Sequence, residues 1–321
     1  MIGKKKVPPH EFLILGLTSA MSHVKNIIHT LILFSLRVFS KLSRVSSSLA
    51  KKFEPEDIQQ TNVIRSTSYN MMAAPDEPYY ADQYWQLIAP FIKDVQKNAL
   101  AMDLGCGQGR LTVLLSKKLD EVKFVACDLS ESAIEMAKEY AKVNCLENID
   151  FKVQGITDCI YSAEKNSVDV LILTEVTVFY PQWIKELTQM LDILKPGGLF
   201  IISLRSQYFN AMCLTRSRNW NNIDTVIKKR EGELFDASTV LTWQTSEEIR
   251  KLLVEEHGLE LLTICGLGAC SGIPGDPHDQ ICRPSDLSAT EKAELMKLEI
   301  ELGKTVPDSG RYILAVVRKP E

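Results

Sequence analysis

The chain has 321 residues, of which 45% are hydrophobic and 24% charged, as expected of a globular protein with a full apolar core. The formal net charge of -4 is uneven: residues 1–52 hold nine Lys or Arg and one acid, Glu11, so the rest of the chain is strongly acidic. An acidic body argues against a nucleic-acid groove, which needs clustered Lys and Arg. None of the eight cysteines has C-x-x-C spacing, so we expect reduced packing cysteines of an intracellular, cytoplasmic protein and no metal site.

Residues 1–52 are expected to form a basic N-terminal extension. Between residues 23 and 44, apolar side chains follow helical spacing, and basic and polar side chains fall mostly on the opposite side. Charges interrupt this run well short of the ~20 apolar residues of a membrane span, and no cleavage site of a secretory signal follows it. Three interpretations stay open: a helix on a membrane surface through residues 23–44, a mitochondrial or other organelle import sequence, or a helix packed on the body or a poorly ordered extension.

A lead-in segment at 53–98, with a helix over 79–95, precedes the body. From residue 99 onward, apolar strand-like runs alternate with amphipathic helical runs. Apolar strands separated by helices are typical of a parallel sheet that is covered on both faces, which predicts a doubly wound α/β domain. Strands are predicted at 99–104, 122–128, 149–153, 168–174 and 199–204, and helices at 111–118, 131–143 and 183–194.

The pattern changes after Leu204. Residues 206–243 have many aromatic side chains and no strong period, and we expect this insertion to cap the substrate, because loops at this edge of such a sheet carry specificity. Capping residues then open two more helices, and a long Gly/Pro loop at 266–286 lies between them. These helices are predicted over 245–257 and 288–302, and the last two strands at 259–265 and 311–317.

The first predicted strand enters a turn with three alternating glycines, in the stretch AMDLGCGQGRLTVLLSKK at 101–118. Such a turn brings bare backbone to a ligand at the carboxyl edge of the sheet, and the next helix presents its N-terminal N–H groups there. A tight turn without a ligand is the simpler alternative. Asp128 ends the next strand, where a carboxylate accepts both hydroxyls of a ribose; alternatively, it caps the helix that begins near Ser130.

A dinucleotide and S-adenosylmethionine would both suit these features. The dinucleotide fingerprint G-x-G-x-x-G requires a glycine where this chain has Arg110, which counts against an NAD-dependent oxidoreductase. The run MDLGCGQGR at 102–110 instead resembles the first motif of the class I S-adenosylmethionine-dependent methyltransferases. FVACDLS at 124–130 resembles their second motif, and DILKPGGLFIISL at 192–204 resembles the segment that enters their fifth strand.

This resemblance implies that residues 99–321 form a seven-stranded, mostly parallel sheet, with S-adenosylmethionine across the ends of its first strands. It implies Asp103 at the methionine amino end of the cofactor, Asp128 at the ribose and Leu129 against the adenine. Family members often have an acid after the third strand, where this chain has Ile156. The implied cofactor contacts are Asp103, Gly105, Cys106, Gly107, Gly109, Asp128, Leu129, Gly155, Ile156 and Glu175.

Methyl transfer from a sulfonium is an in-line displacement, so the protein mainly positions the acceptor and excludes water. A base is needed only where the acceptor arrives protonated. Glu175 is a candidate catalytic base or substrate anchor, and His278 in the long loop is an alternative base, although turn chemistry also explains that loop. Candidate substrate contacts, with core packing or a structural ion pair as alternatives, are Tyr180, Arg205 and Tyr208.

We therefore expect a methyltransferase that moves a methyl group to an O or N atom of a small molecule. The acceptor would be lipid- or quinone-like if residues 23–44 touch a membrane. The alternatives are a protein or RNA methyltransferase, and a protein that binds the cofactor without turnover. The run after the fourth strand, Thr174-Glu175-Val176-Thr177, lacks the Asn/Asp-Pro-Pro-aromatic sequence of adenine-methylating enzymes, which argues against base methylation.

Overall fold

Seven strands pair into one mixed sheet in the computed structural model of the chain, which describes residues 70–93, 95–234 and 240–321. Their order is β3-β2-β1-β4-β5-β9-β8. The first five run parallel, and β9 pairs antiparallel with both β5 and β8, so the predicted seven-stranded, mostly parallel sheet is confirmed. The strands are β1 (Leu100–Leu104), β2 (Lys123–Asp128), β3 (Ile149–Val153), β4 (Val168–Leu173), β5 (Leu194–Arg205), β8 (Glu260–Leu267) and β9 (Tyr312–Arg318).

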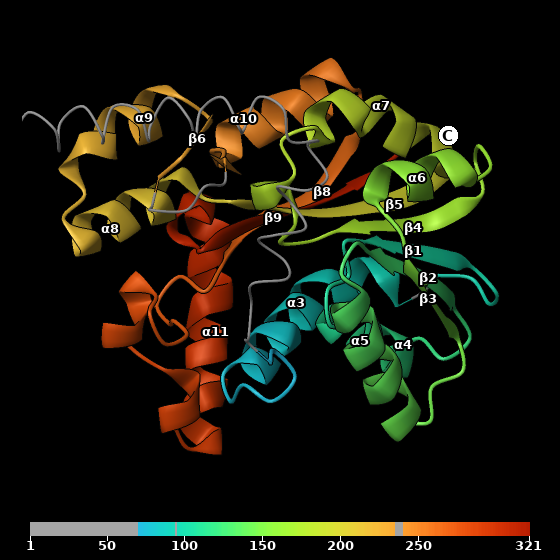
Figure 1. Cartoon of the computed structure of the whole chain (residues 1–321), viewed down its shortest axis with the longest axis horizontal. Coiled ribbons are helices and arrows are strands. Elements are labelled where there is room, and N and C mark those ends of the chain that lie inside the picture. Colours follow the sequence, from blue (N-terminus) through green and yellow to red (C-terminus); the bar gives the residue numbers. More distant parts are fainter. Residues whose placement is uncertain (1–69, 94, 235–239) are drawn as a thin grey trace, which may run out of the picture. The chain divides into compact units, whose positions relative to one another are not determined.

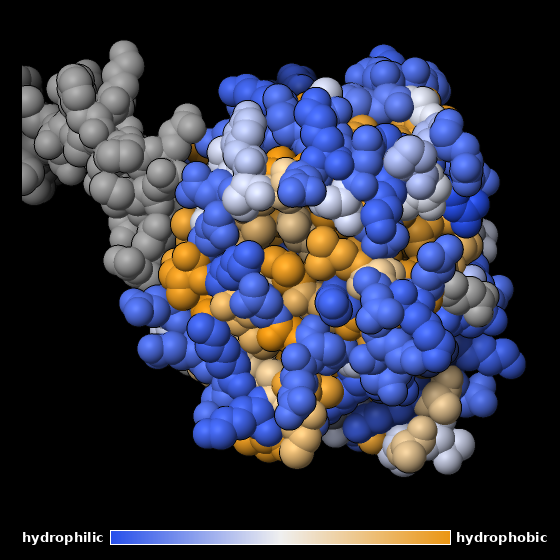
Figure 2. Space-filling view, turned by 90° about the vertical axis from the view of Figure 1, so that its right-hand side faces the viewer, coloured by the Kyte–Doolittle hydropathy of each residue, from blue (hydrophilic) through white to orange (hydrophobic). Residues whose placement is uncertain are grey.

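Helices cover both faces of this sheet (Figure 1). One face packs against α6, α7 and α10, and the other against α3, α4, α5 and α11. On the face shown in Figure 2, hydrophilic side chains surround a central area in which apolar residues reach the surface. The helices are α3 (Glu77–Ile92), α4 (Arg110–Lys118), α5 (Glu131–Val143), α6 (Ile156–Ser162), α7 (Trp183–Ile193), α10 (Ser246–Arg250, continued by a π-helical turn over Lys251–Glu256) and α11 (Ala289–Thr305).

The central strands are apolar on both sides because each side faces its own core. In β4, Leu171 and Leu173 pack in the core beneath α6 and α7, whereas Val170 and Ile172 pack in the core beneath α3 and α4. A strand that is buried on both faces has no polar alternation. This burial explains why the parallel strands were predictable as continuous apolar runs.

Both predicted capping sequences start helices. The side chains of Thr245 and Ser288 each accept a bond from a backbone N–H three residues on, and Glu248 and Glu291 complete the two capping boxes. α11 lies between β8 and β9 in the chain, as expected. Its buried Glu299 accepts hydrogen bonds from α3 and from the 266–286 loop, so this loop is tied to the body by more than turn chemistry.

The insertion at 206–243 is more regular than its sequence predicts. It holds two helices and a two-stranded ribbon around a small core of its own. The first helix contributes one fully buried apolar residue to that core, Leu214, and the second contributes Val226. One such residue in each helix is too few to produce a helical period of apolar residues in the sequence. A third unpredicted helix is α6. The added elements are α8 (Gln207–Ser217), α9 (Ile223–Lys228), β6 (Glu231–Gly232) and β7 (Leu241–Thr242).

The expectations for residues 1–52, including a membrane contact or import role, lie outside the described residues, as does the first part of the lead-in, 53–69. Within the described part of the chain, no helix has the length and apolar character needed to cross a membrane. All eight cysteines are free thiols; Cys127, Cys159 and Cys265 are buried as packing residues, whereas Cys145 is exposed.

Candidate active site

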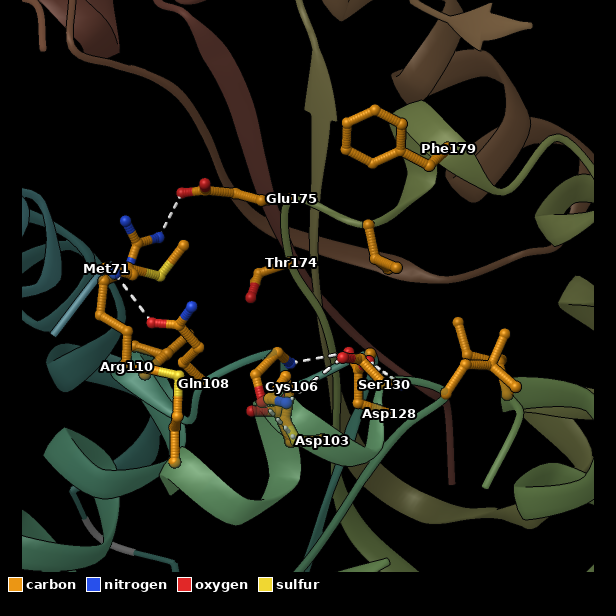
Figure 3. Close-up of a pocket in the computed structure, with 18 of the residues that line it drawn as sticks. Met71, Asp103, Cys106, Gln108, Arg110, Asp128, Ser130, Thr174, Glu175 and Phe179 are labelled. Atoms are coloured by element: carbon orange, nitrogen blue, oxygen red, sulfur yellow. Dashed lines mark hydrogen bonds and ion pairs between the residues drawn. The ribbon is translucent and has the colours of Figure 1, made fainter. Parts of the chain in front are cut away.

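A cavity of about 560 Å³ lies at the carboxyl ends of β1, β2 and β4. This volume is within the range of roughly 300–1,000 Å³ that is typical of small-molecule sites. Figure 3 shows Asp103, Cys106 and Asp128 on one side, and Glu175 and Phe179 on the opposite side. The cavity brings together most of the residues predicted for the site: Asp103, Gly105, Cys106, Gly107, Asp128, Leu129, Ile156, Glu175 and Tyr180.

The three glycines after β1 all have a left-handed backbone, with φ of 75°, 53° and 79° at Gly105, Gly107 and Gly109. A Cβ atom on Gly105 would stand 2.5 Å from Val176 Cγ2, and one on Gly109 would stand 3.0 Å from the Cβ of Ala137. A Cβ on Gly107 would meet no described atom within 4 Å, because this glycine opens onto the cavity. Gly109 therefore packs α4 against α5 and is not among the residues that line the cavity, and its predicted cofactor contact stays a prediction.

Asp128 is buried at the end of β2 and is held by two backbone donors. Its Oδ2 accepts a hydrogen bond of 2.8 Å from the N–H of Gly107, and its Oδ1 accepts one of 2.9 Å from the N–H of Ser130. Burial raises the pKa of Asp128, and these two bonds act in the opposite direction. Ser130 itself caps α5 by accepting a bond from Ala133, so the alternative role of Asp128 as the helix cap is not needed.

Asp103 is buried at the end of β1 and lines the same side of the cavity. One of its carboxylate oxygens accepts a hydrogen bond of 2.5 Å from the hydroxyl of Thr112. Burial, partly offset by this bond and reinforced by the negative charge of Asp128, raises the pKa of Asp103 to about 6. A buried carboxyl with this pKa is poised to ionise when a cation arrives beside it.

Glu175 follows β4 with a left-handed backbone, φ 60°, which is strained for a residue with a side chain. Its N–H donates to the hydroxyl oxygen of Ser203 at 2.9 Å, which holds the turn in place. Its carboxylate pairs with Arg110 at 2.5 Å, and Arg110 also pairs with Glu77 of α3. Burial alone would raise the pKa of Glu175, but the charges of Arg110 and Arg311 hold it below its usual range.

Arg110 has a structural role at the position where the dinucleotide fingerprint has its third glycine. Only a tenth of its side chain is exposed, and it links α3, α4 and the β4 turn through its two carboxylate partners. The two carboxylates raise the pKa of Arg110, so the guanidinium stays charged despite its burial. The sequence marked this position only as a departure from the dinucleotide pattern.

The remaining wall of the cavity is mostly apolar and comes from distant parts of the chain. Met71 lies before α3, and its N–H donates to the side chain of Gln108 at 2.8 Å, which holds this segment against the glycine turn (Figure 3). Phe179 and Val176 come from the segment after β4, and Tyr312 comes from β9. Sequence reasoning missed Met71 and Tyr312 as site residues, since no local motif connects them to the glycine turn.

Tyr180 lines the cavity, as predicted, but its hydroxyl is already engaged. It hydrogen-bonds to Glu186 of α7 and lies 2.9 Å from the hydroxyl oxygen of Thr157 on α6. Its ring therefore contributes mainly a fixed wall. Gly155 caps α6 and is not itself a lining residue, whereas the next residue, Ile156, lines the cavity.

Two predicted substrate contacts do not reach the cavity. The guanidinium of Arg205 lies between the rings of Phe209 and Tyr312, at 4.8 and 4.5 Å from their centroids. Tyr312, which pairs with Arg205 across β5 and β9, occupies the cavity wall in its place. Tyr208 is exposed on α8.

The predicted alternative base, His278, is also away from the cavity. It is buried edge-on against Phe209, and its Nδ1 lies 3.0 Å from the carbonyl oxygen of Gly268. Burial lowers the pKa of His278. No described residue of the insertion at 206–243 lines the cavity either. The insertion instead supports the cavity wall from behind, where Thr242 donates to the carbonyl of Thr177 at 2.8 Å.

The residues present fit S-adenosylmethionine. Each oxygen of Asp128 accepts one backbone bond, which leaves acceptor capacity for ribose hydroxyls. Gly107 leaves room for close approach, and the buried carboxyl of Asp103 offers a partner for an amino group. The fold and the site together are those of a class I S-adenosylmethionine-dependent methyltransferase domain.

Comparison with known proteins places the chain within this class. A family profile described as a methyltransferase domain matches residues 96–256, so the chain belongs to the methyltransferase domain family. An uncharacterized RNA methyltransferase of Clostridium acetobutylicum is 33% identical over 93 residues, which are 29% of this chain and 20% of that protein. A demethylmenaquinone methyltransferase of Staphylococcus aureus is 30% identical over 114 residues, which are 35% of this chain and 46% of that protein.

The fold also matches a solved structure from Listeria monocytogenes that is described as an S-adenosylmethionine dependent methyltransferase. The two align with a TM-score of 0.50 and 16% identity, over 75% of this chain and 100% of that chain. This likeness shows the shared fold. The chain spans less than half the length of each of these two curated relatives.

Proposed function

We propose that this protein transfers the methyl group of S-adenosylmethionine to an O or N atom of a small, largely apolar molecule. The observation that carries the proposal is the division of one cavity into two sides. Asp103 and Asp128 form the side that suits the cofactor, and Phe179 stands on the other side, at the same edge of the sheet (Figure 3). An acceptor held between them would be close to a methyl donor and shielded from water.

The charges around the cavity favour such an acceptor over RNA. Among the described lining residues, the only basic side chain is Arg110, and two carboxylates already neutralise it. The other charged lining residues are acids. A polyanionic acceptor needs exposed Lys and Arg along its path, so this wall would repel it.

Methyl transfer requires the protein mainly to position the acceptor against the methyl donor. The cofactor, when bound, supplies a methyl group already activated on a sulfonium. Glu175 stays ionised and paired with Arg110, so it is better suited to accept a hydrogen bond from an acceptor O–H or N–H than to remove a proton. We therefore assign Glu175 to acceptor anchoring, and Tyr180 and Phe179 to the wall that excludes water.

A lipid- or quinone-like acceptor is the form of this proposal that we favour. The apolar wall suits such a molecule, and one relative is named for demethylmenaquinone. The other relative named above is an RNA methyltransferase, and the acidic cavity argues against that activity here.

The test is methyl transfer from cofactor labelled in its methyl group. The full chain is incubated with three acceptor pools: hydroxylated quinones and aromatic amines, total RNA, and a protein extract. We expect label in the organic-solvent extract of the first pool, abolished by Asp128→Ala. For Glu175→Gln we expect a raised KM for the acceptor with a smaller change in kcat, as for a lost anchor. Label found only in RNA or protein would contradict the proposal, as would cofactor binding without transfer to any pool.

A further inference from the structure

Exposed apolar side chains gather on the outer side of the insertion. Tyr208, Trp220, Ile223 and Ile227 are 55%, 55%, 38% and 58% exposed. Three of them, Trp220, Ile223 and Ile227, follow one another at spacings of three and four residues through the turn at 220–222 and α9, so they share one side. Val226 points the other way and is buried against Trp243. α9 therefore presents more apolar surface to solvent than to its own core.

Tyr208 joins this surface from the neighbouring helix. The preceding residue, Gln207, donates from its side-chain amide to the carbonyls of Val226 and Ile227, at 2.7 and 3.2 Å. These bonds fix the start of α8 beside the end of α9, and Figure 1 shows the two helices together at the flank of the molecule. We call Tyr208, Trp220, Ile223 and Ile227 the docking surface.

Basic residues outnumber acidic ones in the segment that carries most of the docking surface, although Arg216 and Arg230 pair with Asp279 and Glu248. Residues 207–230 contain five Lys or Arg and one acid, Asp224, although residues 53–321 are acidic as a whole. Arg218 and Lys229 are exposed and form no ion pair with any other described residue. Among the described residues, Lys228 pairs with the exposed Asp224, an interaction that leaves most of its charge available.

An anionic membrane surface is the partner that this combination fits. Trp and Ile at a helix surface enter the boundary between headgroups and acyl chains, and adjacent Lys and Arg bind anionic headgroups. A protein partner would need an apolar pocket of matching shape with an acidic rim. A bilayer offers anionic headgroups and an apolar interior, and it needs no matching shape.

The position of the docking surface suits the site. β7 of the insertion is hydrogen-bonded through Thr242 to Thr177, and the segment from Thr177 to Phe179 forms part of the cavity wall. The docking surface is therefore linked to this wall of the cavity through α9 and β7. We propose that the docking surface seats the folded body on an anionic membrane, independently of residues 23–44 and of the identity of the methyl acceptor.

Brominated lipids test this proposal directly, because bromine quenches the fluorescence of a tryptophan that enters the bilayer. The chain has four tryptophans; Trp183 and Trp243 are fully buried, Trp85 is half-buried, and Trp220 is exposed. The probe is a vesicle of brominated phosphatidylcholine with about 30% phosphatidylserine, which supplies the anionic surface potential. We expect quenching of the full chain on these vesicles and much weaker quenching on vesicles without phosphatidylserine.

Variants assign the signal to the docking surface. Trp220→Phe should abolish most of the quenching while the protein still co-sediments with vesicles. Ile223→Asp with Ile227→Asp should abolish the quenching of Trp220, and Val143→Asp, at a still more exposed position at the end of α5, should leave it unchanged. Arg218→Gln and Lys229→Gln should each weaken vesicle binding about fivefold. Thermal unfolding of each variant checks that the fold is intact.

Two outcomes would overturn the proposal. The full chain could bind vesicles with Trp220 unquenched, which would place the contact elsewhere, as in residues 23–44. It could also fail to bind anionic vesicles, with a concentration-dependent dimer lost in the Ile223→Asp, Ile227→Asp variant, which would make a second copy the occupant. None of these measurements depends on methyl transfer, so failure of the proposed reaction would leave this test unaffected.

Discussion

The carboxylate of Asp128 is hydrogen-bonded to the N–H of Gly107 at 2.8 Å, so the end of β2 is tied to the turn after β1. The same turn is held from the other side, because Gly105 and Cys106 donate to the carbonyl of Cys127 at 2.8 and 2.9 Å. The acid and the glycine turn therefore form one rigid unit at the edge of the sheet. A ligand that binds to one of them necessarily meets the other.

Removal of the Asp128 carboxylate should weaken cofactor binding strongly. Hydrogen bonds to a charged group contribute about 1.5–3 kcal/mol each, so loss of the ribose contacts in Asp128→Ala should lower affinity for S-adenosylmethionine about 100-fold. Asp128→Asn keeps one acceptor oxygen and should therefore lose less affinity for S-adenosylmethionine than Asp128→Ala. Calorimetric titration with S-adenosylmethionine and S-adenosylhomocysteine measures this, with NADH as the control ligand. Unchanged affinity in Asp128→Ala would remove this residue from the cofactor site.

Gly107 should matter to the ligand more than to the fold. Its φ is 53° and its missing Cβ faces open space, and exposed Gly258 has the same two properties at φ 67°. Each Gly→Ala change should therefore lower the free energy of unfolding by about 1–2 kcal/mol, because alanine is strained in the left-handed conformation. Gly107→Ala alone should also lower cofactor affinity, because its methyl group would fill part of the cavity. Denaturant unfolding and calorimetry of the two variants separate these effects; equal affinities would show that the ligand does not approach Gly107.

The sequence predicted the parts of this protein that depend on local patterns. The parallel strands are buried on both faces and so form continuous apolar runs, and the two capping boxes start helices at Ser246 and Ala289. The glycine turn and Asp128 were predictable because their chemistry dictates the residue types at fixed spacing.

The missed features depend on contacts between distant segments. Tyr312 was assigned to a strand, but its place in the cavity follows from antiparallel pairing of β9 with β5, which puts it opposite Arg205. The same pairing explains why Arg205, although it ends a central strand, does not reach the cavity. Met71 depends on a bond to Gln108, 37 residues away, and no periodic pattern records such a contact.

Arg110 should be important for stability as well as for the site. Its replacement by Met would leave Glu77 and Glu175 buried without their shared cation, and breaking a buried ion pair in this way costs about 3–5 kcal/mol. The triple variant with Glu77→Gln and Glu175→Gln should recover much of that loss, because it removes the uncompensated charges. Denaturant unfolding measures both. Lys165→Met, which breaks an exposed pair with Asp192, is the control and should leave the free energy of unfolding nearly unchanged.

A stability loss in Arg110→Met no larger than in Lys165→Met would show that the three-residue ion pair contributes nothing to the fold. Failure of the triple variant to recover stability would instead assign the loss to packing of the arginine side chain against Tyr84, whose ring centroid lies 5.8 Å from the guanidinium carbon.

Asp103 should make both folding and cofactor binding depend on pH. Burial raises its pKa in the folded protein to about 6, from an ordinary value of 3.8. The folded state therefore binds more protons than the unfolded state between about pH 4 and pH 6. The stabilisation that this provides is complete below pH 4 and is lost as the pH rises through 6, so Asp103→Asn should flatten the dependence of unfolding free energy on pH in this window.

Bound cofactor should lower the pKa of Asp103, because a charged amino group beside this carboxyl favours its ionised form. Affinity for S-adenosylmethionine should therefore rise as the pH increases toward 6, by up to about tenfold per pH unit, and then level off. Calorimetry of the parent and Asp103→Asn between about pH 5 and pH 7.5 tests this. The variant should bind more weakly at the upper end and show no step near pH 6. A step of the same size in both proteins would mean that another group titrates, and that Asp103 does not face the cofactor's amino end.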